Sequence, residues 1–244
     1  MKLNEKKTQN IIFNFTKDHQ FSAQIKLKNE NLEVVNKTKL LGAVITSDLK
    51  WHENTKFIIK KANKKMIMLH KFSKFTNNKS HLVHIFNSQV RGVLEYCSTV
   101  WHSSLTEGDC NDIERVQKAA VRLIMGNKYQ GYKEALQYMS LESLKERREK
   151  MALNFAKKSL RLDKFSELFP FNNANAKHLM KKRNHEKYAV TNANTERYRK
   201  SAVPFLQRLL NDDYARQKKD LLQVNNDWNL SWGLSIVTYS AKLL

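Results

Sequence analysis

The sequence predicts a mainly α-helical protein with a small β element near its N-terminus. Glycine and proline are scarce, with 6 Gly and 2 Pro among 244 residues, and this scarcity favours long helices over a sheet-rich fold. From Asp48 onward apolar residues recur at helical spacing, whereas residues 3–45 contain the short runs typical of strands. The length suffices for one large domain or two small ones.

Three short segments predict the β element. Residues 11–15 (IIFNF) and 39–45 (KLLGAVI) are rich in apolar and β-branched residues, and residues 21–27 alternate apolar and polar side chains. The polar residues 17–20 and 28–31 between them indicate turns. Because a few short strands do not make an independent sheet, we expect this region to be the edge of a larger one.

A helix over residues 56–74, entered from a turn at Asp48, is predicted to have two opposite faces. At 100° per residue, apolar residues gather on one side and lysines on the other, with Ile67 the one apolar residue among the lysines. The apolar stripe comprises Ile58, Ala62, Met66 and Leu69, and the basic face comprises Lys56, Lys60, Lys64, Lys71 and Lys74. Such a helix can pack on one side and face a polyanion on the other. An ordinary solvated surface helix is the alternative.

Two further helices follow, the first from about residue 78 or 80 to residue 96. The second begins at Asp109 or Asn111 as its N-cap and ends at Gly126, the residue type favoured after a helix C-terminus. It repeats the plan of the lysine helix, because opposite its apolar stripe lie Arg115, Lys118 and Arg122. Two basic helices are stronger evidence for a polyanion groove than one.

The remaining elements are shorter or less regular. Helices are expected at residues 132–139 and 144–162, and a short one begins near residue 201. Residues 171–187 are polar and basic without periodicity, which indicates a linker or a loop ordered by a ligand. The last stretch, residues 225–244, contains two tryptophans and is interpreted as a cover for exposed core.

Composition points to an anionic partner. The chain carries 44 Lys plus Arg against 23 Asp plus Glu, a formal net charge of +21, which makes a nucleic acid or an anionic surface the natural partner. An AT-rich genome, in which Asn and Lys are frequent, also explains part of the excess. Two cysteines give no disulfide framework, and no signal peptide or membrane-spanning run is recognised, so the sequence predicts an intracellular protein with no membrane partner.

Signals for chemistry are weak. His81 and His84 stand three residues apart on a predicted helix, but a zinc site needs further ligands and none is close in sequence. Cys97, His102 and Cys110 match no zinc spacing, and the pair Asp212-Asp213, expected in a short polar turn, is interpreted as a helix cap or a solvent-facing pair. No phosphate-binding glycine loop or nucleophile elbow is found. We therefore predict no catalytic residue, metal or cofactor.

The order of several short motifs carries a resemblance. They are Leu3-Asn4 with residues 6–8, KLLGAVI at residues 39–45 followed by Leu49 and Trp51, VLEYCSTVW at 93–101, IERVQKAA at 113–120, LESL at 141–144 with Glu146-Arg147-Arg148, and TERY at 195–198. This series resembles the C-terminal part of the reverse transcriptases of non-LTR retrotransposons of the LINE or jockey-like type. The resemblance covers about residues 3–206.

The resemblance implies an RNA-directed DNA polymerase fragment. Residues 1–50 would be a palm remnant whose Leu41-Gly42 hairpin is similar to the primer grip, and residues 51–168 would be a helical thumb-like bundle. Residues 169–244 would form a basic linker and tail. The aspartate pair of this family, which holds the two metal ions, belongs upstream of Leu3, so we expect no polymerase activity from these 244 residues.

Two hypotheses follow. In the first, the chain is the thumb end of a reverse transcriptase that binds a template–primer duplex through its backbone, without sequence preference. Its other partner would be the missing palm and fingers portion of a longer chain. In the second, it is a decayed or repurposed basic helical interaction protein. An active enzyme would require a site assembled with another chain that carries the palm.

Overall fold

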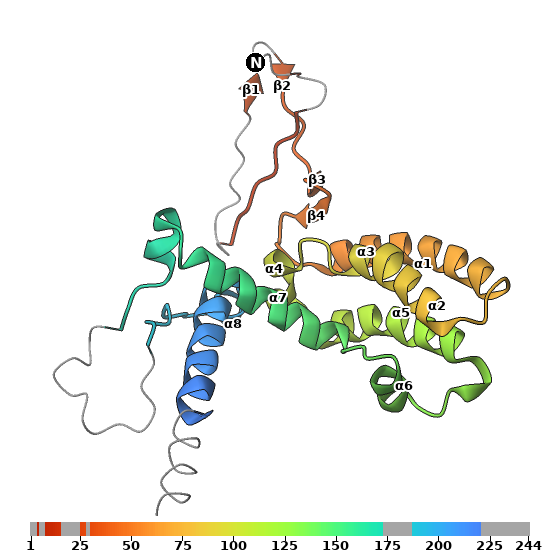
Figure 1. Ribbon diagram of the computed structural model, residues 1–244. Helices are drawn as coiled ribbons and strands as arrows, with labels where there is room; N and C mark the ends of the chain where they lie inside the picture. The colour runs from red at the N-terminus through yellow and green to blue at the C-terminus, as the bar shows by residue number, and fades with distance from the viewer. Residues whose placement is uncertain (1–3, 5–7, 16–24, 28–29, 173–186, 221–244) are drawn as a thin grey trace, which may run out of the picture. The chain divides into compact units, whose positions relative to one another are not determined.

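The fold is mainly α-helical, as the sequence predicts, with the small β element preceding the helices (Figure 1). The structure is a computed structural model, and the residues that it describes are 4, 8–15, 25–27, 30–172 and 187–220. By its contacts the chain divides into two compact units, residues 1–151 and 152–244. The predicted boundaries at residues 50 and 168 divide the chain by inferred role rather than by contacts, and they stay a prediction.

The β element consists of two antiparallel ribbons of two strands each. In the first ribbon β1 (Lys26–Leu27) pairs with β2 (Glu30–Asn31). In the second, β3 (Lys37–Leu40) pairs with β4 (Ala43–Thr46), and Leu40 stands opposite Ala43. Among the residues that the structure describes, the two ribbons do not join into one sheet.

The predicted strand at residues 11–15 is wrong. These residues lie outside any strand, and the nearest pairing is an isolated parallel bridge between Asn10 and Val34. The aromatic side chains of Phe13 and Phe15 are exposed. Strand formation depends on a partner strand as well as on propensity, and residues 11–15 belong to neither of the two described ribbons. Of the predicted strand at residues 21–27, residues 21–24 lie outside the described residues.

Helices make up the rest of the first unit. In chain order these are α1 (His52–Ser73), α2 (Lys79–Ile85), the π-helical η2 (Phe86–Arg91), α3 (Gly92–Leu94), α4 (Ser98–Trp101), η3 (His102–Ser104), α5 (Glu107–Met125), η4 (Gly126–Lys128), α6 (Tyr132–Tyr138) and α7 (Leu144–Ser159), whose residues from Ala152 on belong to the second unit. The predicted helix at residues 78–96 is thus confirmed in extent, with a π turn in its middle. Cys97 ends it in the left-handed region at φ 53°.

The fifth helix begins earlier than predicted. Thr106 is its N-cap, because the Thr106 hydroxyl accepts a hydrogen bond from the Asp109 backbone N–H at 3.1 Å. The predicted caps, Asp109 and Asn111, are therefore wrong. Asp109 is buried and instead accepts a hydrogen bond from the Thr106 hydroxyl, and its Oδ1 lies 2.8 Å from Nδ1 of His52.

One apolar core holds the first unit together. The stripe of α1 packs against the stripe of α5, and α2, η2 and α3 cover the same core. Its fully or nearly fully buried members include Ile58, Ala62, Leu69, Phe86, Val90, Leu94, Trp101, Ile113, Ala120 and Leu144. Each large aliphatic or aromatic side chain buried in this way contributes about 1.5 to 3 kcal/mol.

Buried polar contacts fix the register between α5, α6 and α7. The Glu114 carboxylate accepts the Tyr132 hydroxyl and also the Leu144 backbone N–H at 3.1 Å, so it caps the first turn of α7. The side-chain amide of Gln117 donates to the Tyr132 oxygen and to the Glu142 carbonyl, both at 2.9 Å. Burial and the adjacent Glu114 carboxylate raise the pKa of Tyr132. The capping box of Ser143 and Glu146 completes the start of α7.

The second unit has a smaller core of its own. After the end of α7 come η5 (Asp163–Leu168) and α8 (Glu196–Arg199), and residues 202–220 are helical. The core residues are Ala152, Ala156, Phe169, Tyr188, Leu206 and Leu210. The helix predicted near residue 201 is confirmed, but the polar turn at Asp212-Asp213 is wrong, since both residues lie inside this helix. Asp213 pairs with Lys157 at 2.8 Å.

Two predicted segments of the second unit lie partly or wholly outside the described residues. Of the predicted linker at residues 171–187, residues 173–186 lie outside the described residues, as does the whole stretch 225–244. Phe171 at the start of the linker and Tyr188 directly after it form an isolated antiparallel bridge, and their rings stack with centroids 5.6 Å apart.

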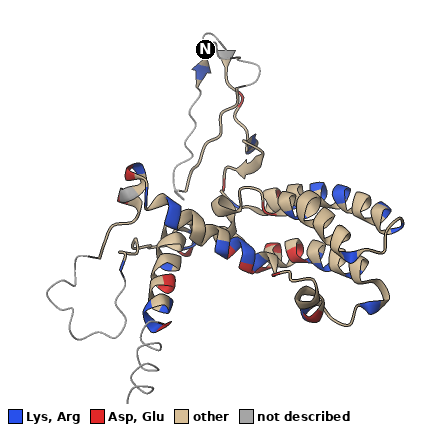
Figure 2. Ribbon diagram, viewed as in Figure 1, with Lys and Arg blue, Asp and Glu red and all other residues tan. Residues whose placement is uncertain are grey.

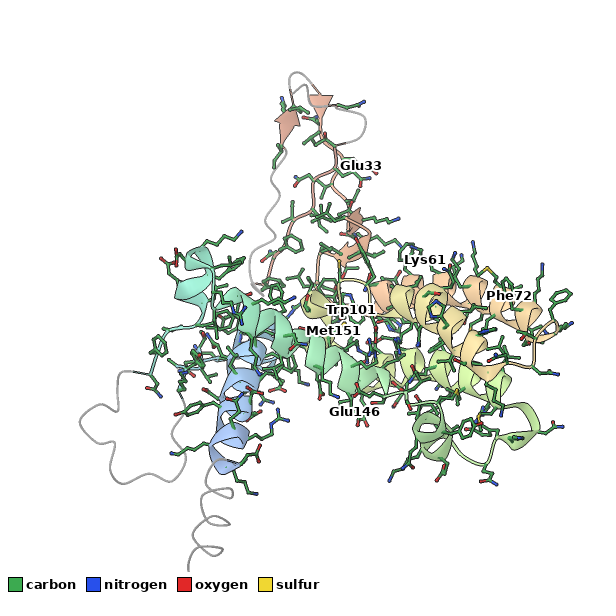
Figure 3. All side chains as sticks on the ribbon, viewed as in Figure 1. Glu33, Lys61, Phe72, Trp101, Glu146 and Met151 are labelled. Carbon is green, nitrogen blue, oxygen red and sulfur yellow. The ribbon has the colours of Figure 1, made fainter. Side chains whose placement is uncertain are left out.

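A buried cation lies beside a buried imidazole in the first unit. Arg148 of α7 is fully buried, and its Nε donates to Nδ1 of His102 at 3.2 Å, while its guanidinium lies 5.9 Å from the ring of Trp101 (labelled in Figure 3). Burial, and then the positive charges of Arg148 and Lys145, lower the pKa of His102 to about 4. His102 is therefore neutral at pH 7 and accepts a hydrogen bond from a cation.

This arrangement predicts a loss of stability below neutral pH. The unfolded chain has an ordinary histidine pKa of about 6.5 and takes up a proton as the pH falls, whereas folded His102 stays neutral until about pH 4. Stability is thus complete above the unfolded pKa and falls between the two values, by about 2 kcal/mol from pH 7 to pH 5. Urea unfolding at the two pH values measures this difference. His102→Gln keeps an acceptor for Arg148 without titrating, and an equal loss in this variant would exclude His102 as the source.

Candidate nucleic-acid interface

The predicted two-faced helix is present as α1. Its apolar stripe is buried against α5, with Ile58, Ala62 and Leu69 almost inaccessible and Met66 half-buried. The five predicted basic residues of this helix and its C-terminus are all exposed. Figure 2 shows Lys and Arg spaced along α1 in the first unit. Packing of one face is what fixes the direction of the other.

An open groove of about 640 Å³ runs between α1 and α5. From α1 it is lined by Lys56, Ile59, Lys60, Asn63, Lys64 and Ile67, and from α5 by Asp112, Arg115, Val116 and Ala119. Four of the predicted binding residues, on two helices distant in sequence, therefore meet along one surface. Lys56, Lys60 and Lys64 follow one another at four-residue intervals, about 6 Å apart along the helix axis.

The charges in the groove are unequally compensated. Lys56 pairs with Glu53 at 3.1 Å, and Arg115 pairs with Asp112 at 2.8 Å. No ion pair joins Lys60 or Lys64 to a carboxylate in the part of the chain that the structure describes. The middle of the groove therefore carries uncompensated positive charge.

After Glu53 in its first turn, α1 and the residues that follow it contain no acidic side chain up to Glu95. Between Glu53 and Glu95 there is no Asp or Glu, while the same stretch holds eight lysines and one arginine. An ordinary solvated helix face intersperses both signs, and like charges at i,i+4 disfavour an isolated helix. An unmixed basic stretch is therefore better explained by an anionic partner than by solubility.

The other four predicted cations lie outside the groove. Lys71 is in the last turn of α1 and Lys74 is its C-cap, and both are exposed further along the same helix. Lys118 Nζ lies 5.3 Å from the ring centre of Tyr132, and Arg122 Cζ lies 5.5 Å from that of Tyr129. These two cations of α5 stack on tyrosines near α6. The structure thus groups Lys56, Lys60, Lys64 and Arg115, and leaves the others on neighbouring surface.

Sequence reasoning missed part of the groove and its edge. Ile67, which interrupts the basic face of α1, lines the groove together with Asn63 and Ala119. On the other flank of α1, the Phe57 ring is contacted by Lys39 Nζ at 5.0 Å and by Lys61 Nζ at 5.4 Å. The helical spacing of residues 112, 115 and 119 was a usable signal for the groove. The contact of Lys39 from β3 had none, because it depends on where the hairpin docks.

The hairpin that resembles a primer grip is fixed to the helices. Leu41 and Gly42 form its two-residue turn with φ of 47° and 91°, the geometry of a type I′ turn. The Tyr96 hydroxyl donates to the Leu41 carbonyl at 2.8 Å, and the Val44 N–H donates to Oδ1 of Asn54 in α1 at 3.0 Å. The Leu41 side chain itself is 84% exposed. The turn therefore presents an apolar tip held from both sides.

The structure also bears on the metal-ligand and membrane signals that the sequence was searched for. Among the residues that the structure describes, no group of three or more His, Cys, Asp or Glu side chains lies close enough to hold a metal ion. His81 and His84, the pair noted in the sequence, both line a second pocket next to the end of α1. No described helix is both long and apolar enough to cross a membrane.

Comparisons with protein-family models, with curated proteins and with solved structures found no match. The resemblance to non-LTR reverse transcriptases therefore rests on the sequence motifs. The case for a function rests on the geometry and charge of the α1–α5 groove.

The hairpin turn predicts a specific sensitivity. Gly42→Ala places a Cβ 3.0 Å from Cε1 of Tyr96 at a φ of 91°, so it should destabilise the fold by about 1 to 3 kcal/mol. Urea unfolding measures the loss, and faster hydrogen exchange in β3 and β4 would locate it. Gly92→Ala is the matched control, because nothing lies within 4 Å of its added Cβ and its backbone is helical. This control should be neutral or slightly stabilising; similar losses in both variants would contradict the assignment.

Proposed function

We propose that this chain binds the phosphate backbone of a nucleic-acid duplex along the α1–α5 groove, as the thumb-like part of a non-LTR retrotransposon reverse transcriptase. The observation that carries the proposal is the convergence of Lys56, Lys60, Lys64 and Arg115, from two helices, on one groove. The proposal concerns binding and includes no reaction.

The residue types favour backbone contact over base reading. Lysine supplies charge on a flexible stem without the planar fork that recognises base edges, so the expected binding is largely independent of sequence. The three lysines of α1 stand at regular intervals and can contact successive phosphates of one strand, and Arg115 faces them from α5. An RNA–DNA hybrid is the expected ligand, because the resemblance is to a reverse transcriptase.

The resemblance motifs support the thumb-like interpretation because they contain the residues that connect the helices. Glu95 accepts two hydrogen bonds from the Arg147 guanidinium, at 2.7 and 3.3 Å. Tyr96 joins the hairpin, and Glu114 and Gln117 join α5 to α6 and α7. The motif residues thus hold the helices of this chain together, and this structural role supports the thumb-like interpretation.

A second candidate function is a basic helical interaction protein with no polymerase role. The observation that favours it is the exposed apolar surface of the hairpin, where Leu40 and Leu41 both face solvent. Binding of anionic vesicles or of an acidic protein at a salt concentration that abolishes hybrid binding would favour this candidate. Co-sedimentation with anionic vesicles, beside hybrid binding at the same salt, separates the two.

Changing Lys56, Lys60 and Lys64 together to Ala should weaken the dependence of hybrid binding on salt. Each phosphate contact releases counterions, so the slope of log K against log salt should fall in magnitude by roughly 2 to 3 units. Fluorescence anisotropy with a labelled RNA–DNA hybrid between 50 and 200 mM salt measures the slope.

The matched control is the triple variant Lys128→Ala, Lys133→Ala and Lys145→Ala. These three lysines are also exposed and lie in the same unit, but they do not line the groove. Both variants lose the same formal charge, so a slope that changes equally in both would indicate diffuse attraction and reject the groove.

A further inference from the structure

The connection between α1 and α2 exposes aromatic side chains. Phe75 is 86% exposed and Phe72, at the end of α1, is 43% exposed. Phe72 is labelled in Figure 3 at the end of α1, beside this connection. Large aromatic residues so exposed on a helical hairpin tip do not stabilise the fold, and they are typical of a surface that contacts a partner.

A pocket adjoins the ring of Phe72, three residues before Phe75. It has a volume of about 550 Å³, within the range of small-molecule sites, and is lined by Phe72, Thr76, Ser80, His81, His84 and Ile85. Its walls combine one aromatic face and one aliphatic side chain with two imidazoles and two hydroxyls. A flat heteroaromatic ring with polar edges matches this combination, since it can stack on the phenyl ring and form hydrogen bonds at its rim.

Positive charge connects this tip to the groove. At 100° per residue, Lys71 lies on the same side of α1 as Lys56, Lys60 and Lys64, and Lys74 follows at the C-cap. No carboxylate lines the pocket, and none occurs in the sequence between Glu53 and Glu95. A strand that leaves the groove along this row of lysines arrives at the exposed rings.

We propose that the hairpin tip, formed by Phe72, Phe75, His81 and His84 with Lys71 and Lys74, binds an unpaired nucleotide of the strand whose duplex part occupies the groove. This deepens the proposed function and rests on it for the duplex. Phe75 and Phe72 supply stacking surfaces, His81 and His84 supply hydrogen-bonding groups for the base edge, and the two lysines contact the flanking phosphates. Stacking of this kind tolerates any base.

An anionic membrane is the other surface that an aromatic tip flanked by lysines contacts. The lining of the pocket favours the nucleotide. The hydroxyls of Thr76 and Ser80 and the imidazoles of His81 and His84 would lose their hydrogen bonds to water among acyl chains, whereas a base returns such bonds. Binding to an anionic membrane is therefore the alternative that the experiment below distinguishes from nucleotide binding.

The test compares two RNA–DNA hybrids, one blunt and one with a short single-stranded extension of uridines, bound by the full chain. The extended hybrid should bind more tightly than the blunt one. Phe75→Ala should lower affinity for the extended hybrid by roughly 5- to 100-fold and leave blunt binding unchanged, because one base loses its stacking partner. Phe75→Tyr should restore the affinity. Phe155→Ala removes a phenyl ring that is 44% exposed in the second unit, outside the tip, and serves as the control that should change neither.

The outcomes separate this inference from the proposed function. If the chain binds the blunt hybrid and Phe75→Ala does not weaken binding of the extended hybrid, the nucleotide site at the tip would be rejected. Duplex binding in the groove would be retained. If the unaltered chain does not bind the blunt hybrid but binds the extended hybrid in a manner that depends on Phe75, the result would support the nucleotide site at the tip and reject duplex binding in the groove. If Phe75→Ala reduces binding to phosphatidylserine vesicles and not to the extended hybrid, the tip contacts membranes and the inference is wrong.

Discussion

The apolar contact between α1 and α5 is the constraint on which the rest of the first unit depends. Ala62 and Ala120 are completely buried in the shared core, and such small side chains let two helices approach closely. The larger residues Ile58, Ile113 and Val116 fill the space beside them. A helix that buries one stripe has no freedom to turn about its axis, so this contact also directs Lys60 and Lys64 into the groove. The proposed binding surface is thus a consequence of core packing.

Polar contacts then select one arrangement from those that the apolar core permits. Hydrophobic burial is not directional, whereas the contacts from Glu95 to Arg147 and from Glu114 to the start of α7 are satisfied in one register only. Arg148 is the costly member of this set, because a buried guanidinium beside a neutral His102 retains its desolvation penalty. Glu95, Glu114, Arg147 and Arg148 all lie within the resemblance motifs, so these motif residues hold the helices together in this chain, whereas His102 lies outside the motifs.

The sequence was sufficient for the faces of helices and insufficient for the contacts between elements. Periodicity identified the buried stripe and the basic face of α1, because both depend only on local geometry. The strand at residues 11–15 was predicted wrongly, since strand formation depends on a partner elsewhere in the chain. Likewise, helical spacing places Lys118 and Arg115 on the same face of α5 and does not distinguish them. In the structure Lys118 stacks on Tyr132, whereas Arg115 lines the groove. Which cations meet is decided by tertiary packing.

The charge of α1 has an energetic consequence for the free protein. The stretch of residues 54–94, which begins within α1 after Glu53, has eight lysines and no carboxylate; it repels itself in the compact state, and the apolar core must offset that repulsion. A polyanion in the groove removes the repulsion at the same time as it forms contacts, so part of the binding free energy comes from relief of a cost within the folded chain. Because the ligand binds the folded state, it also stabilises that state in proportion to its affinity. The same uncompensated lysines that weaken the isolated helix would strengthen the proposed complex, and salt, which screens the repulsion, would also weaken the attraction.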